Sequence, residues 1–203
     1  MKRTLLTLLL LFGGAFAQQE ATISGIIKTE GDMPDGTRVS IHVVDRDNVW
    51  QREVASVAPV GGTFSITTTP VPADELQPFR SGAVLLSGLQ NEYTVTPEDA
   101  NYTQGRINMY VDANANDMFD RVVDAFYIGV PSLKEEDEVG FFSLIYVDKD
   151  VTVSGKGVDL NLKAGWNIFS LRLPTEGPET YAVSQTVDDA VLDVFLSQSP
   201  GQP

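Results

Sequence analysis

The stretch from position 110 to position 124 contains an alternating series of oxygen-bearing side chains. Asp or Asn occupies positions 1, 3, 5 and 9 of a loop that begins at Asp112. Loops with this spacing curl around a hard cation, and the residue at position 7 contributes its main-chain carbonyl. Calcium prefers such a mixture of carboxylate and carbonyl oxygens. The sequence therefore predicts one Ca²⁺ site formed by Asp112, Asn114, Asn116, Met118 through its carbonyl, Asp120 and, at position 13, Asp124.

The loop departs from the EF-hand pattern at two positions. Position 6 is Asp117, where an EF-hand has Gly for its sharp turn, and position 12 is the apolar Val123. No flanking helix is expected, so a strand ending at Val111 would deliver Asp112 into the loop. In the alternative interpretation, the Asn and Asp side chains only form Asx turns in a solvated connection. Both interpretations place a loop between two strands, and only the first predicts a bound ion.

The composition excludes several other kinds of site. The 203 residues include no Cys and a single His, so disulfides, thiolate chemistry and multi-histidine metal sites are excluded. The 28 acidic against 14 basic residues argue against nucleic-acid binding, which needs a basic face. The acidic run at 135–138 is typical of a solvated loop. A hydrophobic content of 42% is sufficient for a packed core. These counts predict a folded, acidic protein that binds no nucleic acid.

No catalytic centre is predicted. His42 alternates with Ser40 on the polar face of its strand, which predicts an exposed side chain, and the nucleophile-elbow motif G-x-S-x-G does not occur. The many carboxylates leave a glycosidase-type pair open without favouring any particular pair. Trp50 is predicted to be exposed, where it could stack on a sugar. Trp166 alternates in phase with Ile168, as a core residue does.

Residues 1–17 have the features of a secretory signal peptide. Lys2 and Arg3 precede an apolar run, and Ala15-Phe16-Ala17 supplies the small-residue cleavage pattern. The apolar run is shorter than the roughly 20 residues that a spanning helix needs. We therefore expect Gln18 to begin the mature chain and the protein to be exported to the periplasm, the cell surface or the medium. No later segment is apolar enough to span a bilayer.

Alternating apolar and polar residues dominate the rest of the chain and predict strands. Turn signals recur about every 10 residues, a spacing typical of β-sandwiches. Parallel α/β folds need crossover helices, for which these turns leave no room. The pattern therefore predicts an all-β fold, an antiparallel β-sandwich. Its strands are expected at 21–27, 38–43, 49–57, 63–68, 83–86, 106–111, 122–128, 141–147, 151–154, 158–162 and 165–173.

Two features of the organisation stay open. In segment 186–196, Thr186 and Asp189 resemble a capping box, which starts a helix, whereas the apolar residues alternate as in a strand. We favour the strand. A Pro-rich bridge between positions 70 and 78 interrupts the rhythm of strands. We expect residues 18–203 to form one β-sandwich domain, with a division near 70–80 as the alternative.

Short motifs between positions 21 and 68 carry a resemblance. They are Ile23-Ser24-Gly25-Ile26-Ile27, a Pro-Asp-Gly loop at 34–36, Val39-Ser40-Ile41-His42-Val43 and Gly62-Thr63-Phe64-Ser65-Ile66. Together they resemble the carboxypeptidase-regulatory-like, transthyretin-type β-sandwich over about a quarter of the chain. That resemblance implies a non-catalytic extracytoplasmic module for adhesion, spacing or ligand presentation. The Y-V-D-x-N-x-N loop and the segment at 159–167 are similar to uncharacterised secreted bacterial β-proteins, and this similarity implies no activity.

The sequence thus predicts a function of binding or structure. We expect a non-enzymatic module of the cell envelope or cell surface, with a calcium-stabilised loop and with an envelope protein or a glycan as partner. The alternative is a carbohydrate-binding or carbohydrate-active protein that uses Trp50 or a carboxylate pair. Glycan binding that is lost in Trp50→Ala would favour the carbohydrate-binding alternative.

Overall fold

The computed structural model describes residues 18–29, 31–44, 50–80, 93–133, 138–155 and 158–195. The predicted signal peptide and the predicted strand at 83–86 lie outside these ranges. Within them the chain forms fourteen strands and one short 3₁₀ helix, Ala73–Glu75, and no helix there is long and apolar enough to cross a membrane. The predicted all-β fold is confirmed.

Many of the strands follow one another with short connections, as the recurring turn signals predict. They are β1 (Thr22–Lys28), β2 (Thr37–Val44), β3 (Trp50–Val57), β4 (Thr63–Thr67), β5 (Gln77–Pro78), β6 (Thr94–Thr96), β7 (Asn101–Val111), β8 (Ala125–Leu133), β9 (Glu138–Val147), β10 (Val151–Gly155), β11 (Val158–Leu162), β12 (Gly165–Pro174), β13 (Thr180–Ser184) and β14 (Thr186–Phe195).

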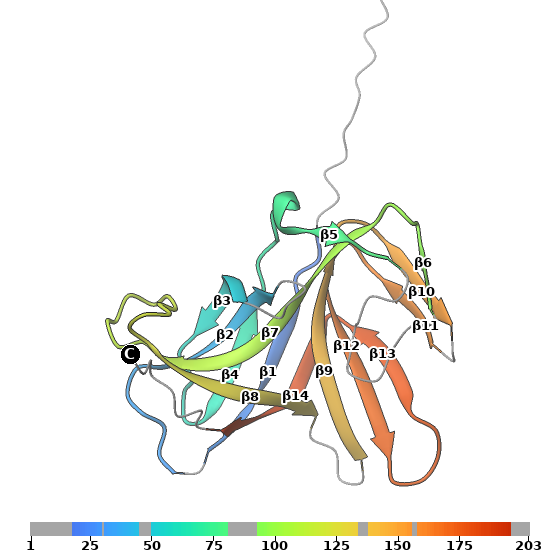
Figure 1. Cartoon of the computed structure of the whole chain (residues 1–203). Coiled ribbons are helices and arrows are strands. Elements are labelled where there is room, and N and C mark those ends of the chain that lie inside the picture. The colour runs from blue at the N-terminus through green and yellow to red at the C-terminus, as the bar shows by residue number, and fades with distance from the viewer. Residues whose placement is uncertain are drawn as a thin grey trace, which may run out of the picture.

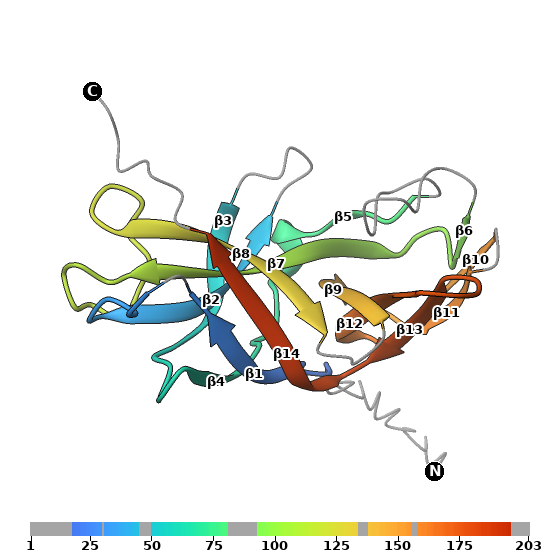
Figure 2. The same cartoon turned by 90° about the horizontal axis from the view of Figure 1, so that it is seen from below.

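The main sheet divides into two branches at β7 and β8. These strands pair with each other beside the loop at 112–124 and then diverge to opposite ends of β9 (Figure 1). β7 continues through β2 to β3, and β8 continues through β14 and β1 to β4. The two branches curve around a common interior, so the main sheet is nearly closed (Figure 2).

The pairing of the named strands is antiparallel, as predicted, with one exception among the described residues. β14 lies between β8 and β1 and runs parallel to β1. The strand interpretation of segment 186–196 is therefore confirmed from Thr186 to Phe195. The capping-box interpretation is wrong because both edges of this segment are used by neighbouring strands.

The interior of the main sheet holds the larger core. Val39, Ile41 and Val43 point into it from β2, as their alternation predicts. Trp166 is fully buried there, in line with the prediction, and its indole Nε1 donates a hydrogen bond to the Thr69 carbonyl at 2.7 Å. Residues from both sides of the Pro-rich bridge contribute to this core.

A second, three-stranded sheet of β6, β10 and β11 covers the outer face of β9 and β12. Ile145 and Val147 of β9 and Phe169 of β12 point into this smaller core, while Leu144 and Ile168 point into the larger one. Both faces of β12 are thus covered, which explains why every residue from Gly165 to Ser170 is buried.

The segment of the transthyretin-type resemblance is distributed over both branches. β1 and β4 pair with each other in one branch, and β2 and β3 pair in the other. The resemblance itself stays a prediction.

Candidate functional site

The predicted calcium loop connects the end of β7 with the start of β8. Met109–Val111 pair with Ala125–Tyr127, and this hairpin stem fixes the two ends of the loop. Asp112 follows the last residue of β7 directly, as predicted, and Asp124 precedes the first residue of β8. The sequence therefore places one carboxylate at each end of the loop.

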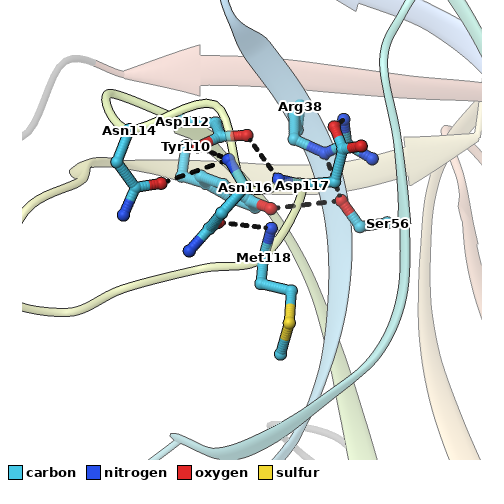
Figure 3. Close-up of polar contacts among 8 residues, drawn as sticks. All are labelled: Arg38, Ser56, Tyr110, Asp112, Asn114, Asn116, Asp117 and Met118. Carbon is cyan, nitrogen blue, oxygen red and sulfur yellow. Dashed lines mark hydrogen bonds and ion pairs between the residues drawn. The ribbon is translucent and has the colours of Figure 1, made fainter.

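The carboxylates of Asp112 and Asp124 are buried and each accepts two main-chain hydrogen bonds. Asp112 Oδ1 accepts from the N–H of Asn116 at 3.1 Å, and Oδ2 accepts from that of Asp117 at 2.8 Å (Figure 3). Asp124 Oδ1 accepts from the N–H of Ala113 at 2.9 Å, and Oδ2 from that of Asp120 at 2.6 Å. The two carboxylates organise the loop from opposite ends.

The other predicted ligands form local turns. Asn114 Oδ1 accepts from the N–H of Asn116 at 3.2 Å, and Asn116 Oδ1 accepts from that of Met118 at 2.9 Å. Asp120 Oδ1 accepts from the N–H of Val122 at 2.9 Å. Each bond joins a residue to the second one along the chain, which is the Asx-turn pattern of the alternative interpretation. Met118 is 63% exposed, and its side chain points away from these contacts (Figure 3).

The structure brings part of the predicted ligand set together. The N–H of Asn116 donates to both Asp112 Oδ1 and Asn114 Oδ1, so these two oxygens lie close to the same main-chain N–H. Across the described ranges, no three acidic or histidine side chains converge closely enough to hold a metal ion. Asp120 and Asp124 therefore do not join Asp112 around one point in this conformation.

Two residues of the loop have the left-handed backbone conformation that usually favours Gly. They are Ala115, with φ 55°, and Asp117, with φ 63°. Asp117 occupies position 6, the place of the Gly in an EF-hand loop. The chain therefore makes the sharp turn there without Gly, at the steric cost that a β-carbon brings.

The loop folds back over the outer face of β2, β3 and β7. Asp117 pairs with the guanidinium of Arg38, whose Nε donates to Ser56 Oγ at 2.7 Å (Figure 3). Ser56 Oγ lies 3.2 Å from the Tyr110 hydroxyl. The Phe119 ring lies edge-on to Tyr110, with ring centroids 5.3 Å apart. Through these contacts the loop lies over polar side chains on the outer face of β2, β3 and β7.

His42 is among the covered residues, so the prediction of an exposed side chain is wrong. It is 2% exposed, and its ring centroid lies 5.4 Å from that of Phe119. Its Nδ1 lies 3.4 Å from Ser40 Oγ, and its Nε2 lies 3.7 Å from Glu53 Oε2. Alternation placed His42 correctly on the outer face, but the loop at 112–124 covers that face.

Burial changes the proton affinity of this pair. Desolvation lowers the pKa of His42 to about 4, with the positive charge of Arg121 as a second cause. Desolvation raises the pKa of Glu53, and hydrogen bonds from the Tyr110 hydroxyl and the Phe119 N–H oppose that rise. His42 is therefore a neutral imidazole at pH 7. Ser40 is fully buried beside it, so in this conformation its hydroxyl does not reach the surface.

Sequence reasoning missed Arg38, Glu53 and Phe119 as partners of the loop. The sequence signal for these contacts was weak, because an aromatic residue in a polar loop has several possible partners. Trp50 begins β3, but its side chain lies outside what the structure describes, and so does most of the acidic run at 135–138.

Comparisons of the chain with protein-family models, with curated proteins and with solved structures find no match.

Proposed function

We propose that the chain is an exported, non-enzymatic binding or structural module of the cell envelope or surface, whose loop at 112–124 binds one Ca²⁺. The observation that carries the proposal is the pair of buried carboxylates, Asp112 and Asp124, at the two ends of a loop built from alternating oxygen donors. An all-β scaffold without α-helices in its described part would hold this loop as a binding surface.

The charge of the loop supports a divalent cation as ligand. Between positions 112 and 124 it carries four Asp and one Arg. Each Asp or Asn oxygen that accepts one N–H retains further acceptor capacity for a cation. Asp112 Oδ1 and Asn114 Oδ1 already face a common N–H. Binding would draw the Met118 carbonyl and the carboxylate of Asp120 or Asp124 toward them, because calcium takes six to eight oxygens.

The buried position of His42 and Ser40 supports a non-enzymatic role. A Ser–His relay requires a serine hydroxyl that substrate can reach, and here Ser40 is fully buried beside His42, whose ring lies against Phe119 of the loop. We propose an envelope protein as the partner. If a binding screen finds a glycan instead, loss of that binding in Trp50→Ala would identify Trp50 as the residue that stacks on the sugar.

The calcium proposal is tested on the mature chain by titration calorimetry with CaCl₂, with MgCl₂ as the comparison ion. We expect heat of binding for Ca²⁺ and a rise in melting temperature of about 5–10 °C at a hundredfold excess over Kd, since mass action then adds about 2.7 kcal/mol. Asp112→Ala should lose both signals. Asp99→Asn is the matched control, because Asp99 is exposed and pairs with Lys149 outside the loop.

Absence of calcium heat in the wild-type chain would overturn the calcium proposal. The contacts of Asp112 and Asp124 with main-chain N–H groups would then be the whole role of these carboxylates. Calcium heat that persists in Asp112→Ala would place the ion elsewhere and would also contradict the assignment.

A further inference from the structure

Among the described residues near the amino terminus, Gln19 is bound through its main chain to the start of β12. Its N–H donates to the Ala164 carbonyl at 3.0 Å, and its carbonyl accepts from the N–H of Trp166 at 2.7 Å. Between these two partners, Gly165 has φ 106°, and a β-carbon there would lie 2.3 Å from the Gln19 main chain. The main chain of Gln19 is therefore seated directly on the start of β12.

Gln18 precedes this seat and is exposed. Its side chain lies beside the hydroxyl of Tyr146, on the strand next to β12. If the signal peptide ends at Ala17, as proposed from the sequence, Gln18 becomes the first residue of the exported chain. Its main-chain nitrogen changes from an amide into a free amine.

We propose that Gln18 is a modification site, at which the new amino terminus cyclises to pyroglutamate. This inference rests on the proposed export. The α-amine nitrogen of Gln18 attacks its own side-chain amide carbon, so a carbon–nitrogen bond forms and closes a five-membered lactam. The bond between that carbon and the amide nitrogen breaks, and the nitrogen leaves as ammonia with the proton of the amine. No oxidant, reductant or second substrate takes part.

The exposure of Gln18 favours the cyclisation, because its side-chain amide and the new amine lie outside the packed interior. The lactam removes the positive charge of the terminal ammonium. It also leaves no free amine for an aminopeptidase that would otherwise shorten the chain toward the Gln19 seat.

The test is mass spectrometry and Edman sequencing of the protein isolated from freshly harvested cells and medium. We expect an amino-terminal peptide that begins at position 18, is lighter than the unmodified peptide by one ammonia molecule and resists Edman degradation. Gln18→Ala should give an open, sequenceable terminus. Gln19→Ala is the matched control, because it keeps Gln18 and changes only the side chain next to it, so its terminus should remain blocked.

A peptide that begins at Gln18 with a free amine would overturn the inference and leave the proposed export intact. A mature terminus at another residue would also overturn the inference, because cleavage would then not make Gln18 the first residue. A chain that keeps residues 1–17 would refute export itself, so the two failures are distinguishable.

Discussion

Acidification is expected to destabilise the fold through His42. The imidazole is buried beneath Phe119, and its pKa is about 4 in the folded protein against 6.5 for an unperturbed histidine. Between these values the unfolded chain binds a proton that the folded chain does not. The free energy of unfolding therefore falls as the pH falls. The contribution is fully present above about pH 6.5 and is lost by about pH 4, and it amounts to about 3 kcal/mol.

Other charged groups around His42 modify this dependence. Glu53 of β3 has a raised pKa, so its contribution to stability has the opposite sign: it is present below the unfolded pKa of 4.5 and is lost as the pH rises through the folded pKa. Arg121 of the loop repels the imidazolium, and Arg106 lies opposite His42 on β7. The opposing change from Glu53 falls between pH 4.5 and its raised folded pKa, so the effect of His42 is clearest at pH values above that folded pKa.

The assay is urea denaturation at pH values from 7 to 4, in the presence of a chelator so that calcium does not contribute. The comparison variant is His42→Gln, which is neutral at every pH. We expect the wild-type chain to lose about 3 kcal/mol more than the variant over this range. Parallel curves for the two proteins would refute the reasoning.

Because the chain has one histidine, NMR gives a second measurement that does not depend on the variant folding. The chemical shifts of the single imidazole should titrate with a pKa of about 4. A midpoint above 6 in the folded protein would show that the loop does not desolvate His42.

Two further predictions concern the contacts that hold the loop and the amino terminus. Phe119→Ala should raise the pKa of His42 toward 6.5, measured by the same NMR titration, and should lower stability by about 1–3 kcal/mol, since the ring is only half-buried. Gly165→Ala should destabilise the fold and speed hydrogen exchange at the N–H of Trp166, because its β-carbon would meet the Gln19 main chain. The control is Gly177→Ala, at φ 109° with nothing within 4 Å, which should have only the backbone penalty of about 1–2 kcal/mol. An unchanged pKa of His42 in Phe119→Ala would contradict the ring contact. Equal losses of stability in Gly165→Ala and Gly177→Ala would contradict the contact between Gly165 and Gln19.

The sequence by itself determined the class of fold and the location of the loop. Alternation in 38–43 and 165–169 specified which residues share a face of a strand, since successive side chains point to opposite sides. Trp166 could thus be assigned to the core, and the spacing that begins at Asp112 predicted a connection between two strands.

The tertiary structure decided what covers each face. His42 lies on the outer face of β2, yet it is buried, because Phe119 of the loop that follows β7 lies against its ring. The parallel pair of β1 and β14 brings the two ends of the described chain together. Alternation reports the side to which a residue points, whereas its burial depends on segments far away in the sequence, and only their packing in three dimensions settles it.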